Sequence, residues 1–122
     1  MGQTPFTRNP PDSRPNWVSS RTETAGRRVE AFPLLGPRET AIDRLAALVE
    51  SQPRTTIGHR DDTSLHAVFV SLVFRFRDDV EFVLSDDRID VLSASRLGHS
   101  DLGANRRRVE RLREAWERQN AG

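Results

Sequence analysis

The sequence predicts a single α+β domain, a two-layer sandwich in which an antiparallel sheet of about five strands carries two helices on one face. The chain has 122 residues, which is enough for one domain and too few for two. Short apolar runs in its middle are separated by pairs of aspartates, as in a meander of strands. Two further segments carry apolar residues at helical spacing. The predicted element order is β-α-β-β-β-β-α.

The first part of the chain differs in composition from the rest. Residues 1–26 hold four prolines among Asn, Ser, Thr and Arg, a composition that favours extended backbone with little to bury. Trp17 is the candidate for attaching this segment to the domain. We therefore expect an extended N-terminal arm over residues 1–26 and one α+β domain over residues 27–122.

The domain is expected to begin with a strand and a helix. Residues 27–34 alternate in polarity, and Pro33 predicts a strand end or an edge position. Gly36 and Pro37 supply an N-cap and first-turn pair for a helix over residues 38–51. Its apolar residues recur on one face, so this helix is expected to pack on the sheet.

The remaining elements form the meander and a closing helix. Strands are expected over residues 55–60, 64–76, 80–85 and 89–95, joined by turns at Asp61-Asp62, Asp78-Asp79 and Asp86-Asp87, because aspartate favours turns. After a glycine-containing loop, Asn105 is the expected N-cap of a helix over residues 106–119. This helix presents a narrow apolar stripe to the sheet.

Apolar residues occupy both faces of the predicted sheet, although the face away from the helices is normally polar. A β-bulge, cover by the N-terminal arm and an interface with a partner all remain as explanations. For the interface, we expect a homodimer or another protein partner on the outer sheet face. The candidate interface residues are Val68, Val70, Leu72, Val83 and Leu92.

Composition and charge narrow the functional classes. All 19 basic residues are arginine, and the formal net charge of +1 gives no global attraction to nucleic acid or anionic lipid, so electrostatic binding requires a local patch. Acidic residues interleave with the arginines of the closing helix, which argues further against nucleic acid. The absence of cysteine excludes disulfides and thiolate chemistry. We expect no membrane span and a cytoplasmic location, since no long apolar run or signal peptide is present.

A polar cluster is expected where the Asp78-Asp79 turn meets the last strand and the start of the closing helix. One interpretation is a structural network, because guanidinium groups pair bidentately with carboxylates. The other is a site for a small anionic ligand, because three arginines, residues 106–108, begin a helix whose N-terminus favours negative charge. The candidate ligand-binding residues are Arg75, Asp79, Glu81, Ser95, Arg96, Ser100, Asp101, Asn105, Arg106 and Arg108.

Other groups of potentially reactive residues give weaker evidence of a functional site. His59 and His66 flank the Asp61-Asp62 turn and match no known spacing of metal ligands, so we predict no metal and no cofactor. His99, Ser100 and Asp101 are consecutive and cannot easily align as a catalytic relay. No catalytic residue is therefore assigned.

Three segments of the chain have a distinctive sequence: residues 11–20 (PDSRPNWVSS), 74–82 (FRFRDDVEF) and 93–110 (SASRLGHSDLGANRRRVE). Together they resemble one protein family of bacteria and plastids, called domain of unknown function 1499. The resemblance covers most of the chain from Pro11 onward and implies a shared fold but no particular reaction. Family members often carry cysteines around the first segment, where Pro11 and Trp17 stand here. They are also often polar at positions 68, 70, 72 and 92, where this chain is apolar, which strengthens the prediction of an interface.

These observations favour a non-catalytic protein-interaction or binding module. The alternative is a small enzyme or carrier that binds an anionic small molecule at the arginine–carboxylate cluster. Burial distinguishes the two hypotheses, because a packed and paired cluster indicates a scaffold and an open cleft indicates a ligand site.

Overall fold

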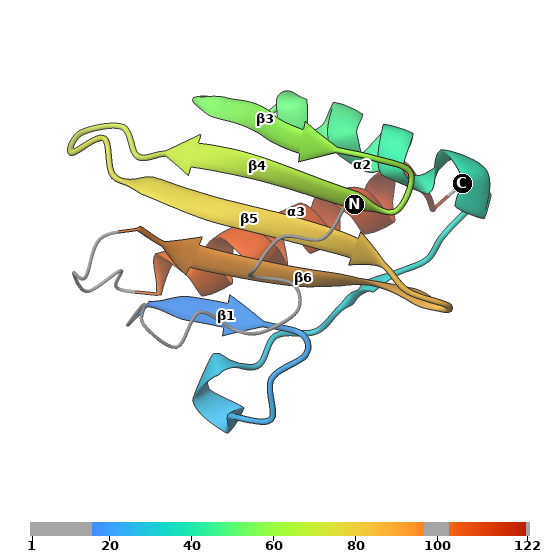
Figure 1. The fold of residues 1–122 in the computed structure, drawn as a ribbon, viewed down its shortest axis with the longest axis horizontal. Coiled ribbons are helices and arrows are strands. Elements are labelled where there is room, and N and C mark those ends of the chain that lie inside the picture. Colours follow the sequence, from blue (N-terminus) through green and yellow to red (C-terminus); the bar gives the residue numbers. More distant parts are fainter. Residues whose placement is uncertain (1–15, 97–102, 122) are drawn as a thin grey trace.

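An antiparallel sheet of six strands, with two helices behind it, forms the protein (Figure 1). A computed structural model describes residues 16–96 and 103–121. The strand order is β1-β6-β5-β4-β3, and β2 also pairs with β6. The sheet is open, and the α+β class with two helices on one face is confirmed, with one strand more than predicted.

Four of the strands follow one another as the predicted meander. The strands are β1 (Trp17–Ser19), β2 (Phe32–Pro33), β3 (Thr55–Arg60), β4 (Ser64–Val70), β5 (Arg77–Leu84) and β6 (Arg88–Ser95). The α-helices are α2 (Ala41–Glu50) and α3 (Ala104–Gln119), and two short 3-10 turns are η1 (Ala25–Arg27) and η2 (Arg38–Thr40). None of the helices in these ranges is long and apolar enough to cross a membrane.

Strand β1 brings part of the predicted arm into the sheet. Trp17 pairs with Ala94 of β6, and both side chains form a small apolar cluster with Leu92 on the face away from the helices. The indole of Trp17 is buried. The predicted boundary at residues 26 and 27 therefore falls after a strand of the sheet, and residues 1–15 lie outside the described part of the chain.

Both helices begin a few residues away from the predicted positions. Thr40, the last residue of η2, is the N-cap of α2, in place of the Gly36-Pro37 pair. Gly103 is the N-cap of α3, with a left-handed φ of 81° that glycine adopts at little cost. Asn105 lies inside the first turn of α3 and is buried, and its side chain bonds to Ser93 and Ser95 of the sheet instead of capping the helix.

The connection between β4 and β5 is the largest departure from the prediction. The sequence predicts a strand to residue 76 and a turn at Asp78-Asp79, but β4 ends at Val70 and the turn spans residues 72–75. Ser71 and Phe76 close this turn, since the Ser71 N–H donates to the Phe76 carbonyl at 2.9 Å. The prediction was wrong because residues 67–74 are apolar apart from Ser71 and contain no Gly, Pro, Asn or Asp to mark the turn.

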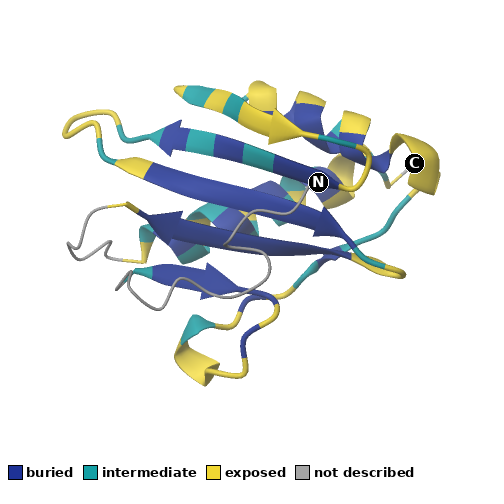
Figure 2. Ribbon diagram, in the orientation of Figure 1, coloured by how far each residue is buried: buried dark blue, intermediate teal, exposed yellow. Residues whose placement is uncertain are grey.

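The aspartate pair instead lies within β5, and both residues are buried. Figure 2 shows that β5 is buried along almost all of its length. Aspartates alone favour a turn. Here their carboxylates lie inside a strand because distant arginines pair with them, and the sequence gives no sign of those partners' positions.

The main core lies between the sheet and the helices. Leu65, Ala67 and Phe69 of β4 face the helices, together with buried residues of α2 and α3. Trp116 of α3 is fully buried, and its indole N–H donates to the Pro33 carbonyl at 2.8 Å. This bond satisfies the polar atom of a large core side chain.

On the opposite face of the sheet, four of the five predicted interface residues are buried or half-buried within the single chain. Val83 and Leu92 are buried within the single chain, at 9% and 2% exposure. Val68 and Val70 are half-buried, whereas Leu72 is 66% exposed in the hairpin. The exposed apolar surface is therefore concentrated at the end of the sheet where β4 turns into β5.

Candidate functional site

The predicted polar cluster is divided between the two faces of the sheet. Asp78 and Asp79 are adjacent in β5, and adjacent strand residues point to opposite faces. Asp78 lies across from Ser95 on the helix side, and Asp79 lies across from Ala94 on the outer side. Two separate polar groups result.

The group on the helix side connects α3 to β5 and β6. The Arg108 guanidinium pairs with the Asp78 carboxylate at 2.9 Å (Nη2 to Oδ2), and its Nη1 donates to Ser93 and Asn105 at 3.2 and 3.1 Å. The Asn105 amide donates to the Ser95 hydroxyl at 3.0 Å, and the Ser93 hydroxyl donates to the Asn105 carbonyl oxygen at 2.7 Å. We name these five residues the helix-side network. Their packed geometry is typical of a structural role.

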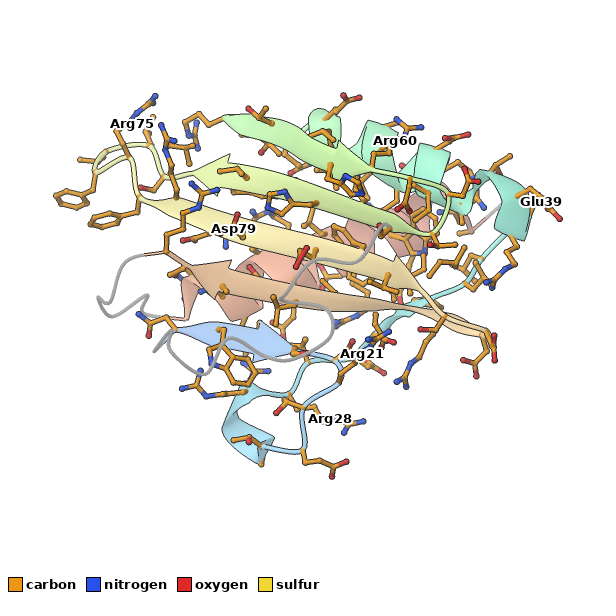
Figure 3. The ribbon with its side chains drawn as sticks, viewed as in Figure 1. Arg21, Arg28, Glu39, Arg60, Arg75 and Asp79 are labelled. Atoms are coloured by element: carbon orange, nitrogen blue, oxygen red, sulfur yellow. The ribbon has the colours of Figure 1, made fainter. Side chains whose placement is uncertain are left out.

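The group on the outer side is centred on Asp79, which is 2% exposed (Figure 3). Arg96 donates to both of its oxygens, from Nε and Nη2, at 3.0 Å each. His66 Nε2 lies 2.8 Å from Asp79 Oδ1. The hydrogen bonds to Asp79 raise the pKa of Arg96 further above its ordinary value, although partial burial acts in the opposite direction. We name Asp79, Arg96 and His66 the outer triad.

A glycine in β3 makes room for the outer triad. A Cβ atom at Gly58 would lie 2.5 Å from His66 Nδ1, too close for any real contact. Close approach of a side chain to the backbone is a common reason for glycine inside a strand. Gly58 thus leaves room beside β3 for the imidazole of His66, which reaches Asp79.

Glu81 lies on the same face as the outer triad, two residues further along β5. It is 1% exposed and lies across from His66 on one side and Leu92 on the other. A cavity of about 10 Å³ adjoins it, large enough for about one water molecule. This space is too small for an organic ligand.

Asp90 forms a third polar centre, which sequence reasoning missed. Its carboxylate accepts hydrogen bonds from the Ser20 and Ser85 hydroxyls at 2.8 Å each and from Arg21 Nε at 3.0 Å. Burial raises the pKa of Asp90, but the bonds from Ser85, Ser20 and Arg21 outweigh it and lower the pKa below its ordinary value. The available signal was an aspartate between the apolar residues Ile89 and Val91.

Several predicted site residues lie apart from these groups. Arg75 is exposed in the β4–β5 hairpin, at the end of the sheet (Figure 3). Arg106 donates to the backbone carbonyls of Arg28 and Gly26 at 2.9 and 3.0 Å. Ser100 and Asp101 lie outside the described residues. A single centre containing Arg75, Arg106 and the carboxylates is therefore not formed.

An open pocket of about 380 Å³ lies at the start of α3, beside Arg106. Gly103, Arg106, Arg27 and Trp17 line it, together with neighbouring residues of β1 and η1. The guanidinium of Arg27 lies 4.4 Å from the centre of the Trp17 ring, a cation–π contact. The pocket contains one predicted residue, Arg106, and a second arginine that the sequence did not single out.

His59 of β3 and His66 of β4, the two histidines considered above as metal ligands, lie across from each other. His59 lies 3.4 Å from Asp61, whereas His66 belongs to the outer triad. Within residues 16–96 and 103–121, no group of three or more His, Asp or Glu residues could hold a metal ion.

The turn at Asp61 provides a pH-dependent contribution to stability. The Thr63 N–H, at 2.9 Å, and other bonds from Ser64 and His59 lower the pKa of Asp61 to about 2 from an ordinary value of 3.8. The stabilisation is therefore complete above pH 4 and lost as the pH falls through 2. We expect Asp61→Asn to lower the free energy of unfolding by up to about 1 kcal/mol at pH 6 and by much less at pH 2, measured by urea denaturation. An equal effect at both pH values would contradict this assignment.

The β4–β5 hairpin carries an exposed apolar tip, which we define as residues 72–74. Leu72, Val73 and Phe74 are 66%, 76% and 74% exposed. Phe74 stacks on Phe76, with ring centres 5.4 Å apart. Only Leu72 of these residues is among the interface candidates predicted from the sequence, and all three were expected inside the strand over residues 64–76.

The fold and these polar groups define a two-layer α+β domain in which buried carboxylate–guanidinium pairs lie on both faces of an antiparallel sheet. A family model described as "Protein of unknown function (DUF1499)" matches residues 9–116. The chain belongs to this family, which confirms the resemblance found in the sequence. No curated protein and no solved structure matches the chain.

Proposed function

We propose that this chain is a non-catalytic binding module and that the β4–β5 hairpin is its contact surface. The observation that carries the proposal is the tip itself, where three neighbouring large apolar side chains are mostly exposed to water. Clustered exposed apolar side chains on proteins of this size commonly mark an interaction site. The half-buried residues Val68 and Val70 extend the apolar surface along β4.

The polar groups support a scaffold beneath this surface. The carboxylates of Asp78 and Asp79 are buried and pair with Arg108 and Arg96. Such pairs fix α3 and the neighbouring strands to β5, which is the strand that leaves the hairpin. The network thus holds the hairpin in a defined position relative to the sheet.

A double substitution at the tip tests the proposal without identifying the partner. In gently lysed cells that express the protein, we expect a fraction of the wild-type chain to sediment in assemblies larger than its own 13.9 kDa. Leu72→Ser combined with Phe74→Ser should shift that fraction to the sedimentation position of the free chain. The matched control is Glu39→Ser combined with Arg111→Ser, two exposed positions in η2 and α3. Equal sedimentation of wild type and tip variant would contradict the proposed contact surface.

A second candidate function is the binding of a small anionic molecule in the pocket at the start of α3. The observation that favours it is the combination of open volume with Arg27 and Arg106 in the lining. Phosphate and carboxylate groups are suitable ligands for such a site, because guanidinium groups bind them bidentately. In this second candidate the anion lies beside Arg27 and Arg106, away from Asp79 and Arg96.

A thermal-shift screen tests this second candidate. We expect phosphate-like or carboxylate compounds to raise the melting temperature of the wild type, and Arg106→Ala to abolish that rise. Arg111→Ala is the matched control, because Arg111 is an exposed arginine of the same helix. If a broad panel of anions leaves the wild-type melting temperature unchanged, the pocket has no role in anion binding.

A further inference from the structure

We propose that the apolar tip of the β4–β5 hairpin inserts into the interface of an anionic lipid bilayer, an inference that rests on the hairpin being the contact surface. The tip presents Leu72, Val73 and Phe74 together on one short turn. In Figure 1 the hairpin extends past the ends of the neighbouring strands, and its tip residues are exposed. Leucine and phenylalanine are the apolar residues typical of interfacial membrane contacts.

Arginines surround the tip. Arg75 lies in the turn, Arg77 begins β5, and Arg54 precedes β3 beside the end of β4, where its Nε donates to the Val70 carbonyl at 3.1 Å. All three are exposed, and they are the charged residues of segments 51–57 and 70–77. These two segments thus carry three positive charges and no negative charge, although the whole chain carries a formal charge of only +1. When an apolar tip enters the acyl region of a bilayer, exposed arginines beside the tip lie at the level of the anionic headgroups and attract them.

The hairpin already has a closed conformation before it binds. The Ser71 N–H donates to the Phe76 carbonyl at 2.9 Å, and the Phe76 N–H donates to the Ser71 hydroxyl at 2.9 Å. Arg75 adopts a left-handed φ of 59°, as residues of short hairpin turns often do. Insertion therefore requires little ordering of the backbone, which favours binding.

The same features disfavour a second copy of the chain as the occupant. Two tips related by a two-fold axis would bring their arginines together, and like charges repel. Three side chains on a convex turn also supply less area than the roughly 800 Å² per partner that stable protein–protein interfaces bury. An anionic bilayer attracts the arginines instead of repelling them. It also surrounds a protruding turn, so the small area of the tip is no obstacle to binding.

Vesicle co-sedimentation with the purified chain tests this proposal. The probe is a vesicle of phosphatidylcholine and phosphatidylglycerol in roughly a two-to-one ratio, compared with a vesicle of phosphatidylcholine alone. We expect the wild type to bind the anionic vesicle, and Leu72→Ser with Phe74→Ser to weaken binding by about 100-fold. Arg75→Gln with Arg77→Gln should weaken binding by about 10-fold on the anionic vesicle. Because these positions are exposed, thermal unfolding should be nearly unchanged in both variants.

The control for charge is Arg111→Gln with Arg118→Gln, which removes two exposed arginines from α3 and should leave vesicle binding within about two-fold. Absence of wild-type binding to the anionic vesicle would overturn the proposal. So would equal binding of the wild type and the tip variant, since it would indicate adsorption by charge alone. If the chain does not bind the vesicles but its sedimentation in cell lysates still depends on the tip, the bilayer is excluded and the hairpin remains a contact surface for protein.

Discussion

Replacing Arg108 with methionine is expected to lower the free energy of unfolding by about 3–5 kcal/mol, because it leaves a buried carboxylate without its counter-charge. The Asp78 carboxylate is 9% exposed, and the Arg108 side chain is 12% exposed. Methionine keeps much of the length of the side chain, so the loss of charge and hydrogen bonds dominates the effect. Urea denaturation of the purified chain gives the free energy directly.

Two companion variants separate this explanation from a general effect of the substitution. Arg111→Met removes an exposed arginine from the same helix and should change stability by less than about 0.5 kcal/mol. Adding Asp78→Asn to Arg108→Met removes the uncompensated charge and should restore part of the loss. A cost below about 1 kcal/mol for Arg108→Met alone would show that the helix-side network does not stabilise the fold.

Neutralising the centre of the outer triad is expected to have the second largest effect. Asp79→Asn should lower the free energy of unfolding by about 1.5–3 kcal/mol, because hydrogen bonds to charged groups contribute about this much. Arg96 is 40% exposed and retains hydration, which keeps the loss below that expected for Arg108. Thermal and urea unfolding measure the effect.

The control for Asp79→Asn is Asp87→Asn, in the exposed turn between β5 and β6. This substitution should change stability by less than about 0.5 kcal/mol. If the two variants unfold at the same urea concentration, the pairing of Asp79 with Arg96 and His66 contributes nothing measurable.

Local chemistry accounts for the parts of the fold that were predictable. The Asp61-Asp62 and Asp86-Asp87 turns lie where the sequence places them, because each closes a hairpin with aspartates in positions they favour. The Asp78-Asp79 pair follows the same local pattern but has arginine partners elsewhere in the fold. A tertiary ion pair overrode turn propensity there, and the true turn at residues 72–75 lacks Gly, Asn and Asp.

The candidate site was less predictable because it depends on strand register. A shift of one residue reverses every side chain in a strand. With the turn misplaced, Asp78 and Asp79 could not be assigned to opposite faces. The pairing of Ser20 with Asp90, 70 residues apart, carries no local signal at all.

The resulting distribution of side chains supports the division of roles that we propose. Buried charges pair within the sandwich, while large apolar residues are exposed at the hairpin. Loops positioned by a rigid scaffold commonly carry the contacts of a binding protein. Variants of the network should therefore alter stability first, and variants of the tip should alter binding.

The most direct measurement is the fluorescence emission of a Phe74→Trp variant on addition of anionic vesicles. Trp17 and Trp116 are buried at 8% and 0% exposure, so the change in emission reports on position 74. We predict a blue shift, as the new indole leaves water for the bilayer interface. Emission that stays unchanged while the protein co-sediments with the vesicles would contradict insertion of the tip.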